Sequence, residues 1–237
     1  MTRLLATLRR DVTSQVRYGL YAVSVFIVLV WGVLLGLLPG AAEIDVAVIV
    51  PAFLAGNLLA TTFYFMAGLV LLEKDEGTLS ALVATPLRDS EYLLSKLITL
   101  TALAVVESLL VVALLFGKGF RWDLLIAGTA LLGALYVLAG FLAVVRYDSI
   151  NEWLFPSAVV VTALLIPLLP HFGLTRHGFY LHPATPAFLL LRAACDPASV
   201  KGWEIVYGLL GSLFWLGMGF VWARRSFDRF IVRSAGG

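Results

Sequence analysis

Six apolar stretches constrain what this chain can fold into more than any other feature of its sequence. A helix needs about 20 mostly apolar residues, within a range of roughly 17–25, to cross the hydrocarbon core of a bilayer. The stretches that approach or exceed this length cover residues 18–38, 46–72, 93–116, 124–145, 153–169 and 203–223. A further run, residues 186–194, is too short to cross and is typical of a re-entrant or interfacial helix. We therefore expect an all-α membrane protein with six transmembrane helices and a short re-entrant segment before the sixth.

The overall composition also indicates a membrane environment. Hydrophobic residues make up 61% of the 237, and the mean hydropathy is +0.96, whereas roughly half the residues of a soluble domain are apolar. A chain of this length has too little polar surface to cover such a core in water, so lipid must be its solvent. The single cysteine, Cys195, excludes an internal disulfide and a multi-cysteine metal site. We expect one transmembrane domain, residues 1–237, with no soluble domain at either end.

The distribution of basic residues predicts the orientation, because Lys and Arg accumulate on the cytoplasmic side of a membrane protein. With both termini on one side, that side carries twelve of the 17 Lys and Arg residues. These twelve are Arg3, Arg9, Arg10, Arg17, Lys74, Arg88, Lys96, Arg146, Arg224, Arg225, Arg229 and Arg233. The opposite side carries Lys118, Arg121, Arg176, Arg192 and Lys201. We therefore expect a multi-pass protein of the cell membrane, surrounded by lipid, with both termini in the cytoplasm.

Residues 1–17 form a predicted amphipathic helix. Leu4, Leu5, Leu8 and Val12 recur at helical spacing, and arginines lie among them. One interpretation is a helix that lies along the inner leaflet of the membrane. The other is a basic anchor that fixes the orientation of the first span. The two interpretations do not exclude each other.

The cytoplasmic loop after the second span is charged and rich in turn residues. Gly77 is expected to break the helix that leaves this span, and residues 78–84 are expected to form a short helix with Leu79 on its apolar side. That helix must end by Thr85, because a residue before proline is biased away from the α region. Pro86 can begin the next helix, where its missing N–H costs nothing. The loop is more ordered than a simple connection needs, which predicts that it binds a partner.

The next cytoplasmic loop, residues 146–152, contains a helix-capping signal. Ser149, followed three residues later by Glu152, fits a capping box at the start of the fifth span. We interpret these two residues as structural.

Motifs typical of an enzyme or a nucleotide-binding protein are absent from the sequence. There is no G-x-x-x-x-G-K-[ST] motif, so the chain cannot supply its own phosphate-binding loop. Neither H-E-x-x-H nor G-x-S-x-G occurs, and the spacing of His171, His177 and His182 matches no familiar zinc site. We therefore expect no catalytic residues, no metal ligands and no cofactor bound by this chain.

Glu107 is the most unusual single residue, because it lies well inside the third apolar stretch. An ionised side chain at the centre of a bilayer costs about 2.5–3.5 kcal/mol on insertion scales, so Glu107 is expected to face protein or water. As a functional residue it would contact a cationic group of a substrate or act as a protonatable switch. As a structural residue it would hold helices together through a hydrogen bond to Asn57, Thr62 or Ser108.

The second span carries further candidates for a substrate pathway. Thr61, Thr62, Phe63 and Phe65 place hydroxyls beside aromatic rings, a combination that suits a flat amphipathic molecule. Ordinary helix packing explains the same residues equally simply. With Glu107 and Asn57, these four residues complete our set of candidate substrate contacts.

The loop after the second span resembles a segment of a known family. Its pattern Glu-x-x-Glu-Gly-Thr-Leu, followed by Thr-Pro-Leu, is similar to the coupling segment of ABC exporter permeases of the type 2 class. The wider order agrees with that class, with a basic amphipathic helix first, then six spans and a broken apolar segment before the last. The residues that the resemblance implies as contacts to the ATPase are Glu73, Glu76, Gly77, Thr78, Leu79, Thr85 and Pro86.

Two other stretches narrow the resemblance. Residues 57–65 and 146–152 are similar to the branch of these permeases that exports fluoroquinolones and other drugs. One position departs from the class, because Ser80 stands where many members carry a glutamate. The acidic contact of those members is therefore not carried over to this position.

The resemblance implies a mechanism and a set of partners. Two membrane subunits pair as a homodimer or heterodimer, and each docks a cytoplasmic ABC ATPase that is a separate chain and binds ATP and Mg. The coupling loop, residues 73–92, transmits the movement of the ATPase to the spans, and the N-terminal helix rests beside the same ATPase. Residues 186–194, within the outer loop of residues 171–202, lie at the outer gate. No nucleic acid is among the implied partners.

Our first interpretation of the sequence is the permease subunit of an exporter for a small amphipathic compound, such as a fluoroquinolone. A second is the export of a lipid, glycan or peptide by the same type of transporter. A third, from a different class, is a membrane scaffold or an intramembrane enzyme without transport activity. Copurification with an ATPase distinguishes the first two from the third.

Overall fold

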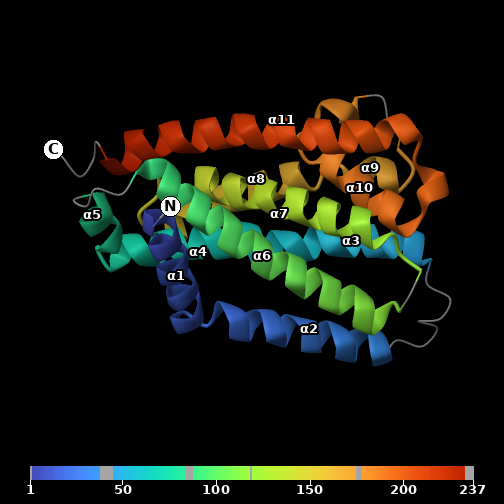
Figure 1. The fold of residues 1–237 in the computed structure, drawn as a ribbon, viewed down its shortest axis with the longest axis horizontal. Helices are drawn as coiled ribbons and strands as arrows, with labels where there is room; N and C mark the ends of the chain where they lie inside the picture. Colours follow the sequence, from blue (N-terminus) through green and yellow to red (C-terminus); the bar gives the residue numbers. More distant parts are fainter. Residues whose placement is uncertain (1, 38–44, 84–87, 118, 175–177, 233–237) are drawn as a thin grey trace.

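The computed structural model describes residues 2–37, 45–83, 88–117, 119–174 and 178–232, and every regular element in these ranges is helical (Figure 1). In chain order the elements are α1 Thr2–Arg17, α2 Leu20–Leu37, α3 Val46–Leu58, η2 Leu59–Tyr64, α4 Phe65–Asp75, α5 Thr78–Val83, α6 Asp89–Leu115, α7 Trp122–Val144, α8 Ile150–Leu164, α9 Leu168–His171, η3 Phe179–Leu181, α10 Thr185–Cys195, η4 Pro197–Ser199, α11 Gly202–Phe227 and η5 Asp228–Val232. The expected all-α architecture is confirmed.

Four of the described helical segments are long and apolar enough to cross a membrane. They are Val46–Asp75, Asp89–Leu115, Trp122–Val144 and Gly202–Val232. A fifth candidate is the pair α1 and α2, which bend by 58° at Tyr18 and Gly19, if the pair counts as one span. The described helices therefore offer four or five candidate spans by length and composition, where the sequence analysis expected six.

The difference from six lies mainly in the predicted fifth span, residues 153–169. In the structure α8 has 15 residues, and 15 residues of α-helix rise about 22 Å, which is less than the hydrocarbon core of a bilayer. The chain turns after Leu164 and resumes as the short helix α9. Pro167 lies at the end of this break and Pro170 within α9, and neither has the N–H that a continuous helix would require. The start of α8 agrees with expectation, because the Ser149 side chain accepts a hydrogen bond from the backbone N–H of Glu152.

The centre of the molecule is α7, which packs against α4, η2, α6, α10 and α11. The backbones in this region come very close together. A Cβ atom at Gly140 of α7 would lie 2.5 Å from the carbonyl oxygen of Phe63, and one at Gly208 of α11 would lie 2.7 Å from Leu190 Cδ2 of α10. Small residues at such positions allow membrane helices to pack by direct van der Waals contact. We call α7, η2, α10 and α11 the packed half of the molecule.

The short apolar run 186–194 forms most of α10, so the predicted helix is present. Its residues from Thr185 to Ala194 are buried, and it packs against α3, α7 and α11. Its place is therefore inside the bundle. Figure 1 shows α10 at one end of the molecule, beside α9.

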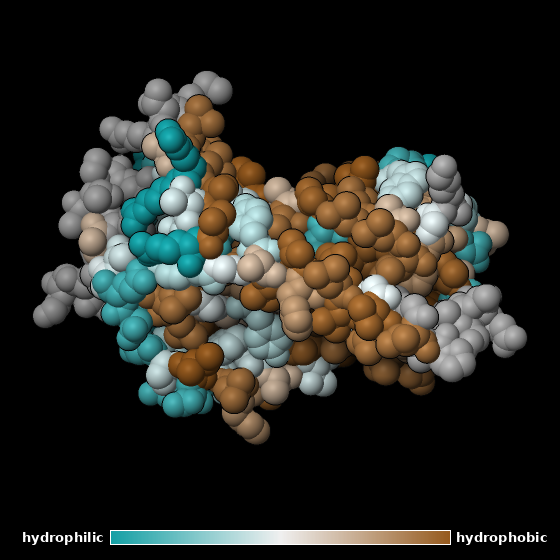
Figure 2. Space-filling view, turned by 90° about the horizontal axis from the view of Figure 1, so that it is seen from below, coloured by the Kyte–Doolittle hydropathy of each residue, from teal (hydrophilic) through white to brown (hydrophobic). Residues whose placement is uncertain are grey.

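The opposite end of the molecule gathers segments that are far apart in the sequence. Figure 1 places α1, α5 and the last turns of the C-terminal helix at this end. The space-filling view in Figure 2 shows hydrophilic residues concentrated at the same end, whereas hydrophobic residues cover most of the remaining surface on that face. We call it the α5 end. The first described helix, α1, and the last described turn, η5, therefore lie at the same end of the molecule.

Candidate functional site

The loop after the second span forms a sharp corner between α4 and α5. Helix α4 ends at Asp75, and Gly77 has φ +67°, a conformation that glycine adopts without steric cost. Thr78 begins α5 and its Oγ1 donates a 3.1 Å hydrogen bond to the carbonyl oxygen of Glu73. The predicted break at Gly77 and the short helix after it are confirmed. We call residues 73–79 the α4–α5 corner.

Leu79 anchors the corner to the rest of the fold. Its side chain is buried, and α5 packs against η5 at the end of the chain. Two further residues of the predicted segment, Thr85 and Pro86, lie outside the described residues.

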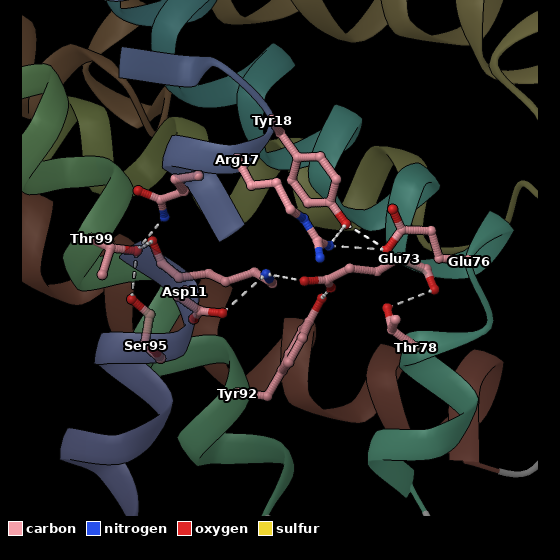
Figure 3. A network of polar contacts seen from close by, with 11 residues as sticks. Asp11, Arg17, Tyr18, Glu73, Glu76, Thr78, Tyr92, Ser95 and Thr99 are labelled. Atoms are coloured by element: carbon pink, nitrogen blue, oxygen red, sulfur yellow. Dashed lines mark hydrogen bonds and ion pairs between the residues drawn. The ribbon is translucent and has the colours of Figure 1, made fainter. Parts of the chain in front are cut away.

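A buried cluster of charges joins the corner to α1 and α6 (Figure 3). Lys96 of α6 is 1% exposed, and its Nζ lies 2.6 Å from Oε1 of Glu73 and 3.5 Å from Oδ1 of Asp11. The Tyr92 hydroxyl donates a 2.7 Å hydrogen bond to the other oxygen of Glu73. Removing one partner of a buried ion pair typically costs about 3–5 kcal/mol, because the other charge is left buried without compensation. Glu73, Lys96, Asp11 and Tyr92 therefore have to stay together; we call them the polar cluster.

Three further polar contacts attach α1 and the residue after it to neighbouring segments. The side-chain amide of Gln15 donates to Thr99 Oγ1 on α6 over 2.7 Å, and both groups are buried. At the end of α1, the Tyr18 hydroxyl donates a 2.6 Å hydrogen bond to Glu76, and Arg17 forms an ion pair of 3.3 Å with the same carboxylate. Burial, and then the hydrogen bond to Glu76, raises the pKa of the Tyr18 phenol. The phenol therefore remains a hydrogen-bond donor across the physiological pH range.

The corner has a third connection, to the loop between α7 and α8. Lys74 Nζ donates to the carbonyl oxygens of Val145 and Tyr147 over 2.7 and 2.8 Å, and it lies 3.0 Å from Asp148. Consecutive residues at the end of α4 thus hold different parts of the molecule. A displacement of the α4–α5 corner would reach α1, α6 and the α7–α8 loop through polar contacts.

Glu107 of α6 lies well away from this corner. Its side chain is paired with Asn57 of the second predicted span. Asn57 Nδ2 donates a 3.0 Å hydrogen bond to Oε1 of Glu107, and both side chains are buried. Glu107 also lines a groove between α1, α2 and α6. The hydrogen bond to Asn57 is the contact expected if Glu107 is a structural residue. Its place in the lining of the groove is what a substrate contact would also require.

The four remaining candidates of the second span lie in its packing. A π-helical turn, η2, runs from Leu59 to Tyr64 within the continuous segment, and such turns are frequent at functional sites. The hydroxyls of Thr61 and Thr62 donate to carbonyl oxygens of their own helix, and both side chains are fully buried. Phe63 is also buried and stacks on Trp153 with 6.0 Å between ring centroids, while Phe65 is half-buried. Of the six candidate substrate contacts, Glu107 lines the groove, and Asn57 is connected to it through its hydrogen bond to Glu107.

Comparison with known proteins assigns the sequence of this chain to a family. Residues 2–235 match the fluoroquinolones export permease protein family. The chain belongs to this family. Fluoroquinolones export permease proteins from two strains of Mycobacterium tuberculosis, CDC 1551 / Oshkosh and ATCC 25618 / H37Rv, are each 33% identical to it over 238 residues. The alignment covers 100% of this chain and 99% of each relative, so it includes both the polar cluster and Glu107.

Sequence analysis of this permease missed several residues of the polar cluster. Lys96 was counted only as a positive charge of the cytoplasmic side, although it lies inside an apolar stretch as Glu107 does. Asp11 and Gln15 are four residues apart and share a helix face, yet attention went to the leucines of the same helix. A polar residue inside an apolar stretch, matched with a polar pair on a neighbouring amphipathic helix, was the signal that could have found them.

The orientation of the permease's first helix follows from the same contacts. The face of α1 that carries Asp11 and Gln15 is buried against α6, whereas Leu5 and Val16 are 65% and 59% exposed. The predicted apolar stripe is therefore only partly turned away from the protein, because Leu4 and Leu8 are half-buried. Helix α1 is a bonded part of the fold as well as an amphipathic surface helix.

Proposed function

We propose that this chain is the membrane-spanning permease subunit of an ATP-driven ABC exporter. It moves a small amphipathic compound, of the drug class that includes fluoroquinolones, out across the cell membrane. Membership of the family and the full-length similarity to two fluoroquinolones export permease proteins support the substrate class. The observation that carries the mechanism is the α4–α5 corner, which polar contacts join to three other parts of the molecule.

The proposed topology has six spans with both termini in the cytoplasm. Helix α2 supplies the first span, with α1 along the inner membrane surface, and α8 with α9 supplies the fifth. Helix α10 serves as the re-entrant segment before the sixth span. The common position of α1, α5 and η5 at the α5 end supports this arrangement, because one side of the membrane must hold all three.

In the proposed mechanism two permease subunits pair, and each binds one cytoplasmic ATPase that carries ATP and Mg. The ATPase contacts the α4–α5 corner and the outward surface of α1. Closing of the ATPase dimer pushes on the corner, and the contacts of Glu73, Lys74 and Glu76 pass the movement to α6, the α7–α8 loop and α1. The buried contacts of Glu73 carry most of the force, because ion pairs exposed to water are weak.

Copurification tests the proposal. The permease, extracted in mild detergent from cells that also express a candidate ATPase subunit, should retain that ATPase, and the pair should export a fluoroquinolone from cells or vesicles. If no ATPase is retained and export is unchanged by removal of the ATPase gene, the proposal is wrong.

Gly77 provides a variant that tests the corner itself. Gly77→Val should abolish export while the ATPase still binds, because a β-branched residue strongly resists the φ of +67° found there. The matched control is Gly77→Asn, since asparagine tolerates this region of backbone conformation better than other residues. Export at the wild-type rate by the valine variant would show that the shape of the corner is not needed for coupling.

A further inference from the structure

We propose that the groove between α1, α2 and α6 is a binding site for cationic amphipathic molecules, with Glu107 as the residue that pairs with the cationic group. The inference rests on the proposed function only in taking the bound molecule as cargo. The binding itself follows from the shape of the groove and the chemistry of its lining.

The groove has the size of a small-molecule site. Its volume is 760 Å³, within the roughly 300–1,000 Å³ typical of ligand pockets. In Figure 1 the helices α1, α2 and α6 enclose a triangle, and the lining residues come from all three. Leu8 and Val12 line it from α1, Val25 and Leu29 from α2, and Val106 from α6. A molecule in the groove would thus contact three helices over an apolar surface.

The groove contains few charged side chains, and these differ in their exposure to solvent. Arg9 and Glu107 are the two charged residues among the described side chains that line it. Arg9 is exposed on α1, so water solvates its charge. Glu107 is only 2% exposed and lies among aliphatic side chains. An electrostatic preference in the buried part of the groove is therefore a preference for positive charge.

The partners that the described residues give Glu107 are neutral, Asn57 and Ser24. Asn57 occupies Oε1, whereas Oε2 is buried and makes no hydrogen bond to any described residue. The hydroxyl of Ser24, another lining residue, interacts with the same carboxyl, but it is neutral and cannot balance a negative charge. An unsatisfied buried polar group is costly. An ammonium group bound at this point would donate a hydrogen bond to Oε2 and place its positive charge beside the carboxylate. An apolar lipid chain in the same place could do neither.

The position of Glu107 along α6 defines the shape of the ligand. Thr99 marks the α1 end of the groove, because it lines the groove and accepts a hydrogen bond from Gln15. Glu107 follows Thr99 by eight positions, which corresponds to about 12 Å along an α-helix. The site therefore suits a molecule with a cationic group at one end and an apolar body that extends about this distance toward α1.

Helix α1 links the groove to the polar cluster. Leu8 and Val12 line the groove, while Asp11, between them in sequence, contacts Lys96. A ligand in the groove would thus contact α1, the helix whose polar side chains are bonded to the α4–α5 corner. This arrangement gives a direct route by which a bound molecule alters the corner.

Fluorescent probes test the site without any ATPase. The full-length permease in lipid nanodiscs is titrated with dansylcadaverine, which carries a free amine, and with its uncharged N-acetylated form. The wild-type protein should bind the amine at least roughly tenfold more tightly, as expected for a charge-assisted hydrogen bond in a buried site. Glu107→Gln should bind the two probes with equal affinity, at the level of the N-acetylated form. An unchanged preference for the amine in Glu107→Gln would overturn the proposal.

Two alanines of α6 locate the binding. Ala102 lines the groove and Ala113 does not, and both are exposed, so a phenylalanine can be placed at either without entering the core. Ala102→Phe should weaken binding of both probes, while the matched control Ala113→Phe should leave it unchanged. Wild-type binding by Ala102→Phe would place the probes elsewhere and overturn the proposal. Binding that depends on Glu107, in a permease that retains no ATPase and whose export does not need the ATPase gene, would preserve this site and refute the ABC exporter. The two proposals therefore fail separately.

Discussion

The packed half of the molecule and the pair α1–α2 are attached to the fold by different forces. In the packed half, α7, η2, α10 and α11 meet at glycines such as Gly140 and Gly208, where the neighbouring atoms leave no room for a Cβ. Helix α1 is held instead by a buried ion pair from Asp11 and a buried hydrogen bond from Gln15, both to α6. Helix α2 packs mainly against α1 and α6.

This difference indicates which part of the permease can change shape. Close-packed interfaces have one good arrangement, because sliding one surface over the other creates clashes and voids. A contact made by a few polar side chains fixes only those points, so the rest of the helix that it holds can shift around them. We therefore interpret the packed half as a rigid body and α1–α2, with the α4–α5 corner, as the part that moves and that borders the proposed binding groove.

The comparison predicts its largest effect at Lys96. Lys96→Met leaves Glu73 and Asp11 buried without their cation, so it should lower the free energy of unfolding by about 3–5 kcal/mol. The triple variant Lys96→Met, Glu73→Gln, Asp11→Asn removes all three charges and should recover most of that loss. Thermal denaturation of the three proteins in one detergent measures the difference. A single variant as stable as the wild type would show that the cluster does not hold α1 in place.

A smaller effect is expected at Gly140 in the packed half. Gly140→Ala adds a methyl group that would lie 2.5 Å from the Phe63 carbonyl oxygen, so α7 and η2 must separate, at a cost of about 1–3 kcal/mol. Gly56→Ala is the matched control, because a Cβ at Gly56 meets no atom within 4 Å. Melting curves of both variants decide the point. Equal stability of the two would contradict a rigid packed half.

Much of this architecture could be predicted because it depends on local patterns. The break at Gly77, the start of α8 after Ser149 and the helix within residues 186–194 all follow from residue types and hydrophobic runs. The length of the fifth predicted span could not be fixed in this way. Its apolar composition continues past Leu164, and composition does not show where the prolines that follow will turn the chain.

The candidate sites were predictable only in part, for a different physical reason. Glu107 and Glu73 can each be recognised as candidates from their positions in the sequence, but their partners come from other helices. Lys96 and Asp11 are 85 residues apart, and nothing in either local sequence shows that they meet. The groove has even less of a sequence signal, because its walls are the same aliphatic residues that any membrane helix carries. Sites formed between helices require the packing to be known first.

The most direct test of the central claim is the amount of drug exported per ATP hydrolysed by the triple variant Lys96→Met, Glu73→Gln, Asp11→Asn. The variant would be reconstituted with its ATPase in vesicles and compared with the wild type, and melting curves would confirm that both are folded. If the ion pairs of the polar cluster couple the α4–α5 corner to the spans, the variant should hydrolyse ATP while exporting little or none of the drug. Export per ATP equal to that of the wild type would contradict the account.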